Sequence, residues 1–113
     1  MTKVTLDYDK NRRTLSCNAK GHADFAVAGN DIVCSAVTVL LRTAIQVLSS
    51  MDGIKFESEA VERGTLSFCA EVSEAGSESE IRLECIRNFL ETGLSSISVE
   101  YPDNVCFCKH LED

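Results

Sequence analysis

Apolar and polar residues alternate along four stretches of the chain, and each stretch predicts a β-strand. The first two stretches cover residues 3–8 and 14–19 and are separated by the polar turn 9–12. The second two cover residues 54–59 and 66–72, with Glu62, Arg63 and Gly64 in the turn between them. Because a period of two places alternate side chains on opposite faces of a sheet, these stretches predict two hairpins that each bury one face.

A longer stretch after residue 30 carries apolar residues at steps of three and four, which predicts a helix. Asn30 or Asp31 is expected to cap its N-terminus. The helix is expected to end near Met51, because Asp52 and Gly53 follow and glycine is common just past a helix end. The predicted core-facing stripe consists of Val33, Val37, Leu40, Leu41, Ala44 and Leu48.

A second helix is expected after the polar loop 73–79. Ser77 and Glu80 have the spacing of a capping box, Gly93 marks a point where the helix could break, and Pro102 cannot continue it. Residues 105–110 predict a last strand. The stripe of the second helix consists of Ile81 or Leu83, Ile86, Leu90, Leu94, Ile97 and Tyr101.

The predicted order of elements is therefore ββαββαβ. A mostly antiparallel sheet of about five strands covered by two helices is a two-layer sandwich of the α+β class. We expect a single domain over residues 1–113, a length that suffices to bury a hydrophobic core. Val39, Ile45 and Val47 lie off the stripe of the first helix, and these surplus apolar side chains predict a homodimer through its outer side.

Composition adds a preference for partners and for a compartment. The net charge of -7 disfavours direct nucleic-acid binding and favours a basic partner, although it can also serve solubility alone. Six cysteines with no apolar signal segment at the N-terminus favour reduced thiols in the cytoplasm over disulfides. Arg42 and Gln46 interrupt the first helix, so we expect it to fall short of a membrane span.

The loop at residues 21–30 and the helix after it carry the most suggestive chemistry. Cys34 is expected in the first turn of the helix, and His22 lies twelve residues earlier in the loop. A free thiol has a pKa of about 8.5, which a helix N-terminus lowers, and a neighbouring imidazole can accept its proton. The pattern indicates a thiol nucleophile with His22 as its base, and the backbone N–H groups of Cys34 or Ser35 as oxyanion donors. Asp31 is expected to orient His22, to hold the loop, or only to cap the helix.

On spacing alone, a purely structural interpretation ranks ahead of the catalytic one. Cys34 is then a core residue, because cysteine is among the residue types most often buried, while Asp31 is a cap and His22 an exposed loop residue. A thiol redox sensor is a further alternative, motivated by the six cysteines. A non-catalytic module that holds a basic peptide in the same groove is another.

A second candidate site lies on the last predicted strand. Cys106, Cys108 and His110 occupy alternate positions and should share one face, and cysteine and histidine are zinc ligands. Packing of the two cysteines is the favoured interpretation, because no fourth ligand is evident and zinc ligands usually come from turns. We therefore expect no metal and no cofactor. The many glutamates that follow residue 56 fit a solvated surface better than an acid–base pair.

The segment Gly21-His22-Ala23, followed by Gly29 and by residues 31–38 (DIVCSAVT), resembles the ribosomal-processing cysteine protease family, Prp. The spacing from His22 to Cys34 matches that family, and the likeness covers nearly the whole chain. The late Tyr101-Pro102-Asp103 before a final strand is also similar.

The resemblance implies a cytoplasmic, homodimeric cysteine endopeptidase with no cofactor. Its implied substrate is the bacterial large-subunit ribosomal protein L-twenty-seven, whose short N-terminal extension is cut after a Phe-Phe pair. Cys34 is then the nucleophile and His22 the general base and acid, Asp31 supports the site, and Gly21 gives the loop its turn. Thr38 stands where the family often has serine, so a hydroxyl is kept at this position.

Overall fold

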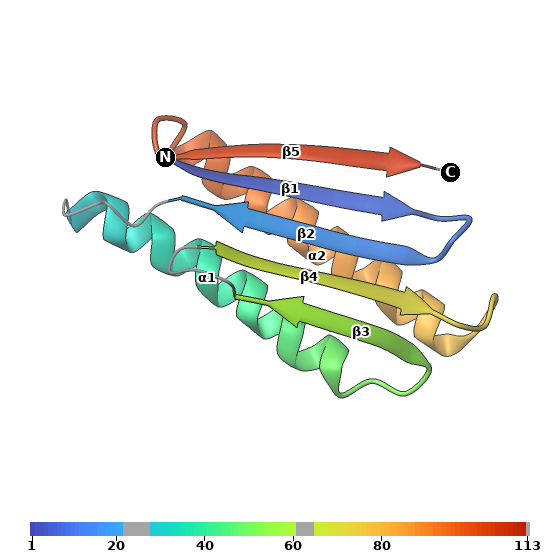
Figure 1. The fold of residues 1–113 in the computed structure, drawn as a ribbon. Coiled ribbons are helices and arrows are strands. Elements are labelled where there is room, and N and C mark those ends of the chain that lie inside the picture. The colour runs from blue at the N-terminus through green and yellow to red at the C-terminus, as the bar shows by residue number, and fades with distance from the viewer. Residues whose placement is uncertain (22–27, 61–64, 113) are drawn as a thin grey trace.

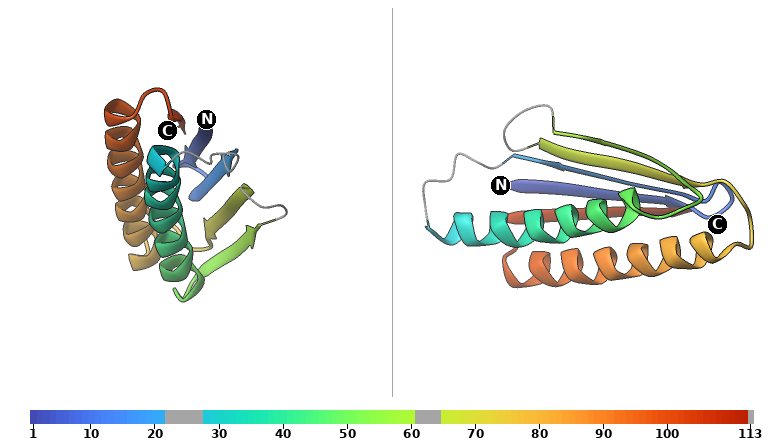
Figure 2. Two further views of the ribbon diagram at one scale, coloured as in Figure 1. Left: turned by 90° about the vertical axis from the view of Figure 1, so that its left-hand side faces the viewer. Right: turned by 90° about the horizontal axis from the view of Figure 1, so that it is seen from below.

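One sheet and two helices form two layers in the computed structural model, which describes residues 1–21, 28–60 and 65–112, with backbone alone for residues 28–31. Both helices lie on the same face of the sheet, and the other face is open (Figures 1 and 2). The order ββαββαβ and the α+β class predicted from the sequence are confirmed. The elements are β1 (Thr2–Asp9), β2 (Thr14–Lys20), α1 (Ala28–Ser49), β3 (Ile54–Glu59), β4 (Thr65–Val72), α2 (Glu78–Glu100) and β5 (Val105–Glu112).

The five strands follow the spatial order β3-β4-β2-β1-β5. Each of the two hairpins pairs antiparallel, and β2 joins them by pairing antiparallel with β4. The exception is β5, which pairs parallel with β1 at the edge of the sheet. α2 crosses over the sheet from the end of β4 to the start of β5, which allows β5 to enter parallel to β1. The sheet is therefore mostly antiparallel, as predicted.

The core lies between the helices and the helix-facing side of the sheet. Val4 and Leu6 of β1 and Leu15 of β2 are fully buried, because the strand alternation turns them toward the helices. The predicted stripe of α1 meets them, with Leu40 partly buried and its other members buried. On α2 the buried residues are Leu83, Leu90 and Leu94, whereas Ile81 is 62% exposed. The hydrophobic pattern thus identified the packed faces, with Leu83 and not Ile81 opening the second stripe.

One helix boundary and one predicted break differ from the expectation. α1 begins at Ala28, so Asn30 and Asp31 are helical residues and not N-caps, whereas its end at Ser49 lies within two residues of the expected Met51. An acidic residue is favourable in the first helical turn as well as at the cap, so sequence alone could not separate the two positions.

α2 runs unbroken through Gly93, because that glycine serves helix packing. A Cβ atom at Gly93 would lie 3.1 Å from Leu40 Cδ1 of α1, so the bare backbone allows the two antiparallel helices to approach closely (Figure 2). At the start of α2, Ser77 is the N-cap and accepts a hydrogen bond from the Glu80 backbone N–H. The Glu80 carboxylate reaches back to the Gly76 N–H at 2.7 Å, one residue beyond the usual capping box.

The segment Ile32–Ser49 of α1 is long and apolar enough to cross a membrane, by length and composition alone. The expectation that Arg42 and Gln46 make it too polar was therefore wrong. In the structure this helix packs on the sheet and on α2, with Val33, Val37 and Leu41 buried in the core. The packing of α1 within a two-layer domain thus explains its apolar character.

Glu91 joins α2 to the edge strand β5. Its carboxylate accepts hydrogen bonds from Lys109 of β5 and from Arg87 one turn earlier, the latter at 2.6 Å, and its side chain is only 16% exposed. The hydrogen bond from Lys109, and then the one from Arg87, lower the pKa of Glu91 below its ordinary 4.5. This carboxylate therefore stabilises the fold above its unfolded pKa, and the stabilisation is lost as the pH falls through the folded value.

Replacement of Glu91 by glutamine is expected to lower the free energy of unfolding by about 1 kcal/mol at neutral pH. The difference from wild type should narrow as the pH falls through the lowered pKa of Glu91, because the wild-type carboxylate is then protonated too. Urea unfolding at several pH values measures both. Arg82→Gln is the control, since the Arg82–Glu78 pair is mostly exposed and should matter little. A difference for Glu91→Gln that does not change with pH would contradict the account.

Candidate active site

Cys34 lies on α1 near the end of the sheet where β1 begins and β2 ends. It is half-buried, and it is the seventh residue of the helix counted from Ala28. The expectation that it sits in the first turn was therefore wrong. Only the first four N–H groups of a helix lack an intrahelical acceptor, so the N–H groups of Cys34 and Ser35 are bonded within α1 and are not free oxyanion donors. The effect of the helix dipole also falls off within the first turn.

The sheet brings two other groups to the thiol. The hydroxyl oxygen of Thr2, at the start of β1, lies 3.8 Å from Cys34 Sγ and 3.4 Å from the carbonyl oxygen of Gly21, just past the end of β2. Thr2 is 6% exposed. A thiol, a hydroxyl and a backbone carbonyl from three distant parts of the chain therefore meet at this end of the sheet.

Gly21 has the backbone conformation that this meeting requires. Its φ is +85°, in the left-handed region that favours glycine. A Cβ atom there would lie 2.8 Å from the carbonyl oxygen of Met1, the residue that precedes Thr2. The chain at the end of β2 can therefore pass this close to the start of β1 only because residue 21 has no side chain.

The structure describes some of the other expected site residues and not others. His22 lies outside the described residues, as do the side chain of Asp31 and its predicted role toward His22. Gly29 was expected within the loop at residues 21–30, but its backbone belongs to α1. Ser35 is exposed on the helix surface, while Thr38, one turn after Cys34 and on the same side of α1, is half-buried.

Thr2 was missed by the sequence reasoning. It extends the alternation of Val4, Leu6 and Tyr8 by one step, so its side chain falls on the helix-facing side of the sheet. A hydroxyl at a position where the pattern calls for an apolar residue was the signal that could have found it.

All six cysteines are free thiols in the structure. Burial raises the pKa of Cys17 to about 12. Burial, and then the carboxylates of Glu57 and Glu71, raise the pKa of the Cys69 thiol. Both shifts make the thiolate scarcer, so neither residue is suited to act as a nucleophile. Cys69 and Cys85 are exposed, so neither packs in the apolar core.

Cys106, Cys108 and His110 share the open face of the sheet, where they pair with Lys3, Thr5 and Asp7 of β1. His110 Nδ1 lies 2.9 Å from the Asp7 carboxylate. Within residues 1–21, 28–60 and 65–112, no three His, Cys, Asp or Glu side chains are placed to hold a metal ion. Cys108 is exposed and Cys106 half-buried, so core packing does not account for both.

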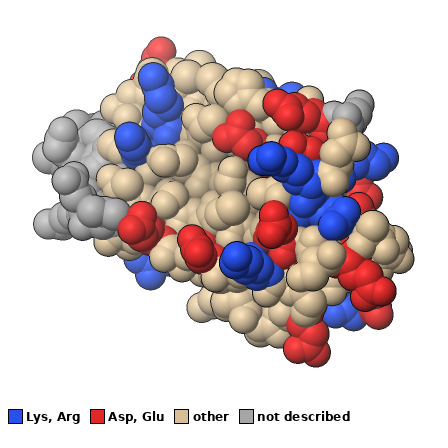
Figure 3. Space-filling view, turned by 45° about the vertical axis from the view of Figure 1, so that its right-hand side comes forward, with Lys and Arg blue, Asp and Glu red and all other residues tan. Residues whose placement is uncertain are grey.

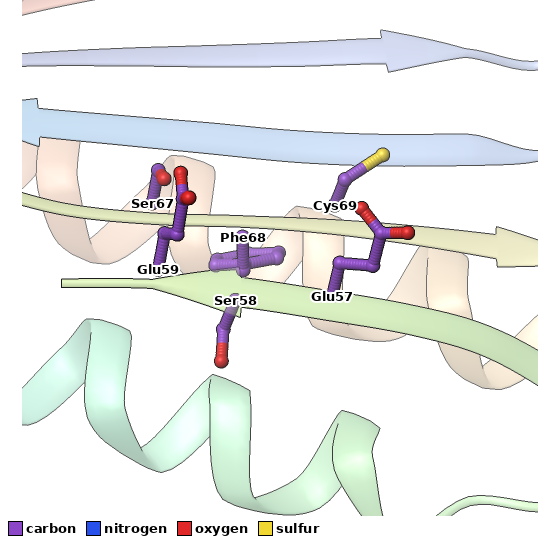
Figure 4. A pocket seen from close by; sticks show the side chains of 6 residues that line it. All are labelled: Glu57, Ser58, Glu59, Ser67, Phe68 and Cys69. Carbon is purple, nitrogen blue, oxygen red and sulfur yellow. The ribbon is translucent and has the colours of Figure 1, made fainter. Parts of the chain in front are cut away.

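A hollow of about 480 Å³ lies at the β3–β4 edge of the sheet. Figure 4 shows Glu59 beside Ser67 and Glu57 beside Cys69, as the strand register requires. These four side chains lie on the open face, opposite the helices. Ser58 and Phe68 also line the hollow, and none of its lining residues belongs to the candidate site. Figure 3 shows acidic and basic side chains interspersed on one face of the molecule, so the net charge of -7 is not gathered into one patch there.

Comparison with known proteins gives one consistent answer. The family model described as "Cysteine protease Prp" matches residues 1–106. The ribosomal processing cysteine protease Prp of Bacillus subtilis (strain 168) is 24% identical over 105 residues, which cover 93% of this chain and 94% of that protein.

Two solved structures share the fold. The crystal structure of SMU.848 from Streptococcus mutans is 20% identical with a TM-score of 0.76, over 99% of this chain and 96% of that one. The ribosomal processing protease Prp of S. aureus, solved in complex with a substrate peptide, is 17% identical with a TM-score of 0.74. That match covers 96% of this chain and 99% of that one.

Proposed function

The chain belongs to the family of the cysteine protease Prp, enzymes that hydrolyse peptide bonds, and from this premise we propose that Cys34 is the nucleophile and His22 the general base and acid. The observation that carries the proposal is the place of Cys34. It is a half-buried thiol beside a buried hydroxyl and a backbone carbonyl, inside the segment matched by the family model. His22 follows Gly21 directly in sequence, which supports a place for its imidazole near this thiol.

The reaction is thiol acyl transfer followed by hydrolysis. His22 takes the Cys34 proton, and the thiolate sulfur bonds to the scissile carbonyl carbon. As the carbon–nitrogen bond breaks, the His22 imidazolium gives that proton to the leaving amine. Water, deprotonated by His22, then attacks the thioester, and its collapse releases the carboxylate product and restores the thiol.

The substrate we propose is the N-terminal segment of a ribosomal protein, L-twenty-seven in bacteria. Support comes from the name of the Bacillus subtilis relative and from the S. aureus relative, which was solved with a substrate peptide. The net charge of -7 favours encounter with a basic ribosomal tail. Six free cysteines support a reducing, cytoplasmic setting.

The substrate is tested with a synthetic peptide that spans the first residues of the host's own ribosomal protein. Mass spectrometry of the products should find one new N-terminus, after an aromatic pair. A peptide with both aromatic residues replaced by alanine is the control and should be cut much more slowly. Binding without turnover would instead favour the non-catalytic peptide-binding module.

A homodimer through the outer side of the helices is also part of this proposal. Val39 is 62% exposed and Val47 is 46% exposed on α1, and Phe89 is 57% exposed on α2. Ile45, by contrast, is partly buried and packs against the core. Exposed apolar side chains on adjoining helices favour association with a second copy.

Light scattering at micromolar concentration is expected to give the mass of a dimer for the wild type. Val39→Glu should give a monomer, because it places a charge in the centre of the proposed interface. Asn18→Glu, at an exposed position on the open face of the sheet, is the control and should remain dimeric. A monomeric wild type, or a dimer unaffected by Val39→Glu, would contradict this interface.

A further inference from the structure

Thr2 is the one polar residue that is buried in the parts of the chain that the structure describes. It opens β1, and its side chain shares the helix-facing side with Val4 and Leu6. Burying a hydroxyl costs free energy unless it finds a hydrogen-bond partner. The partners within reach are the Cys34 sulfur at 3.8 Å and the Gly21 carbonyl oxygen at 3.4 Å.

The sheet holds this hydroxyl in a fixed place. The Thr2 N–H donates to the Asn104 carbonyl oxygen at 2.8 Å, and Thr2 is in register with Val105 of β5. β1 lies between β2 and β5, so its first residue has neighbours on both sides. Threonine is also β-branched and restricted about its first side-chain torsion. The hydroxyl is therefore positioned before any substrate arrives.

A hydroxyl has one proton and can donate to one acceptor at a time, while its oxygen can accept in addition. While Cys34 is a neutral thiol, its S–H can donate to the Thr2 oxygen, and the Thr2 proton is directed to the Gly21 carbonyl. Once Cys34 has lost its proton, the sulfur carries a negative charge and is the stronger acceptor, because hydrogen bonds to an ion are about twice as strong as neutral ones. The Thr2 proton then turns from the carbonyl to the sulfur.

We propose that Thr2 is a positioning residue of the active site, whose hydroxyl donates a hydrogen bond to the Cys34 thiolate and releases the Gly21 carbonyl as it does so. The inference rests on the proposed role of Cys34 as nucleophile. No atom is lost or gained at Thr2: the thiol proton goes to the base, and the threonine proton changes only its acceptor. The hydroxyl supplies a stabilising contact that the helix N-terminus, more than one turn away, does not.

The test measures the rate of alkylation of Cys34 by iodoacetamide as a function of pH, resolved by mass spectrometry of its own peptide. In Thr2→Val, which keeps the shape of the side chain and removes the hydroxyl, alkylation at neutral pH is expected to be roughly tenfold slower. The profile should move to higher pH and reach the same plateau. Thr2→Ser, which keeps the hydroxyl, should stay within about twofold of wild type. The exposed Cys85 and Cys108 are internal controls whose profiles should not move.

Peptide cleavage by the same variants supplies a second readout, in which Thr2→Val should lower kcat and leave KM nearly unchanged. Thr2→Ala replaces Thr2→Val if the valine protein does not fold. An alkylation profile that Thr2→Val leaves unchanged would overturn the proposal, as would a shift that Thr2→Ser fails to restore. Alkylation needs no substrate, so a shifted profile in a protein that cleaves no peptide would disprove the proposed function and still support the Thr2–Cys34 contact.

Discussion

Replacement of Cys34 by alanine is expected to reduce peptide cleavage by at least about a thousandfold, because thiol acyl transfer has no first step without the sulfur. The fold should be retained. Cys34 is half-buried and not part of the buried core, so its loss leaves no large cavity among the packed side chains. Cleavage of the N-terminal ribosomal peptide, followed by mass spectrometry, measures the effect, and thermal unfolding checks the fold.

Cys85→Ala is the matched control for this experiment. Cys85 is an exposed free thiol on α2, so its replacement should leave cleavage within about twofold of wild type. Cys34→Ser is a second informative variant, because its hydroxyl fits the site but is a much weaker nucleophile at neutral pH. If Cys34→Ala cleaves as fast as wild type, Cys34 is not the nucleophile and the proposed mechanism fails.

Replacement of Gly21 by alanine is expected to lower both stability and activity. The new Cβ atom would lie 2.8 Å from the Met1 carbonyl oxygen, and the φ of +85° is unfavourable for alanine. The backbone must move, and with it the contact between the Gly21 carbonyl and Thr2. We expect a loss of about 1–3 kcal/mol in the free energy of unfolding and a fall of more than about tenfold in kcat/KM.

Gly76→Ala separates backbone strain from the clash. Gly76 has a φ of +75°, but a Cβ atom there would meet nothing within 4 Å. Gly76→Ala should therefore lower the free energy of unfolding by about 1 kcal/mol and leave peptide cleavage unchanged. Urea unfolding and peptide cleavage of the two variants give the comparison. Equal effects on activity would show that the close approach at Gly21 has no part in the site.

The fold could be predicted from the sequence because its apolar residues follow two clear periodicities, alternation in the strands and steps of three and four in the helices. The alternation of Val4, Leu6 and Tyr8 could face only one side of a sheet, and the stripe from Val33 to Leu48 could bury only one side of a helix. Gly53, with a φ of +76°, and Pro102 marked the ends of the two helices. Local chemistry and packing agree at each of these positions.

Helix starts and tertiary contacts were harder to predict from the sequence. Asn30 and Asp31 suit an N-cap and a first turn almost equally, so the start at Ala28 could not be chosen from residue preferences. Gly93 was expected to be a possible helix break, because its role is a close contact with Leu40, which is far away in the sequence. The contact of Thr2 with Cys34 spans 32 positions and depends on the whole sheet being in register.

The catalytic assignment came from the motif around His22 and Cys34 more than from physical chemistry. The argument from a helix N-terminus pointed to Cys34 for a reason that the structure does not support, because Cys34 lies in the second turn. What the structure offers in its place is the buried hydroxyl of Thr2, at 3.8 Å from the sulfur. Activation of the thiol is therefore expected to depend on side chains from the sheet and the loop more than on the helix dipole.

Covalent trapping tests the central claim most directly. The wild-type protein is incubated with a substrate-derived peptide that carries a chloromethyl ketone in place of the scissile bond, and the labelled residue is located by tandem mass spectrometry. The account predicts one adduct per chain, on Cys34, and none on the exposed Cys69, Cys85 or Cys108. Labelling of another residue in its place, or no adduct from a preparation that cleaves the parent peptide, would contradict the claim that Cys34 is the nucleophile.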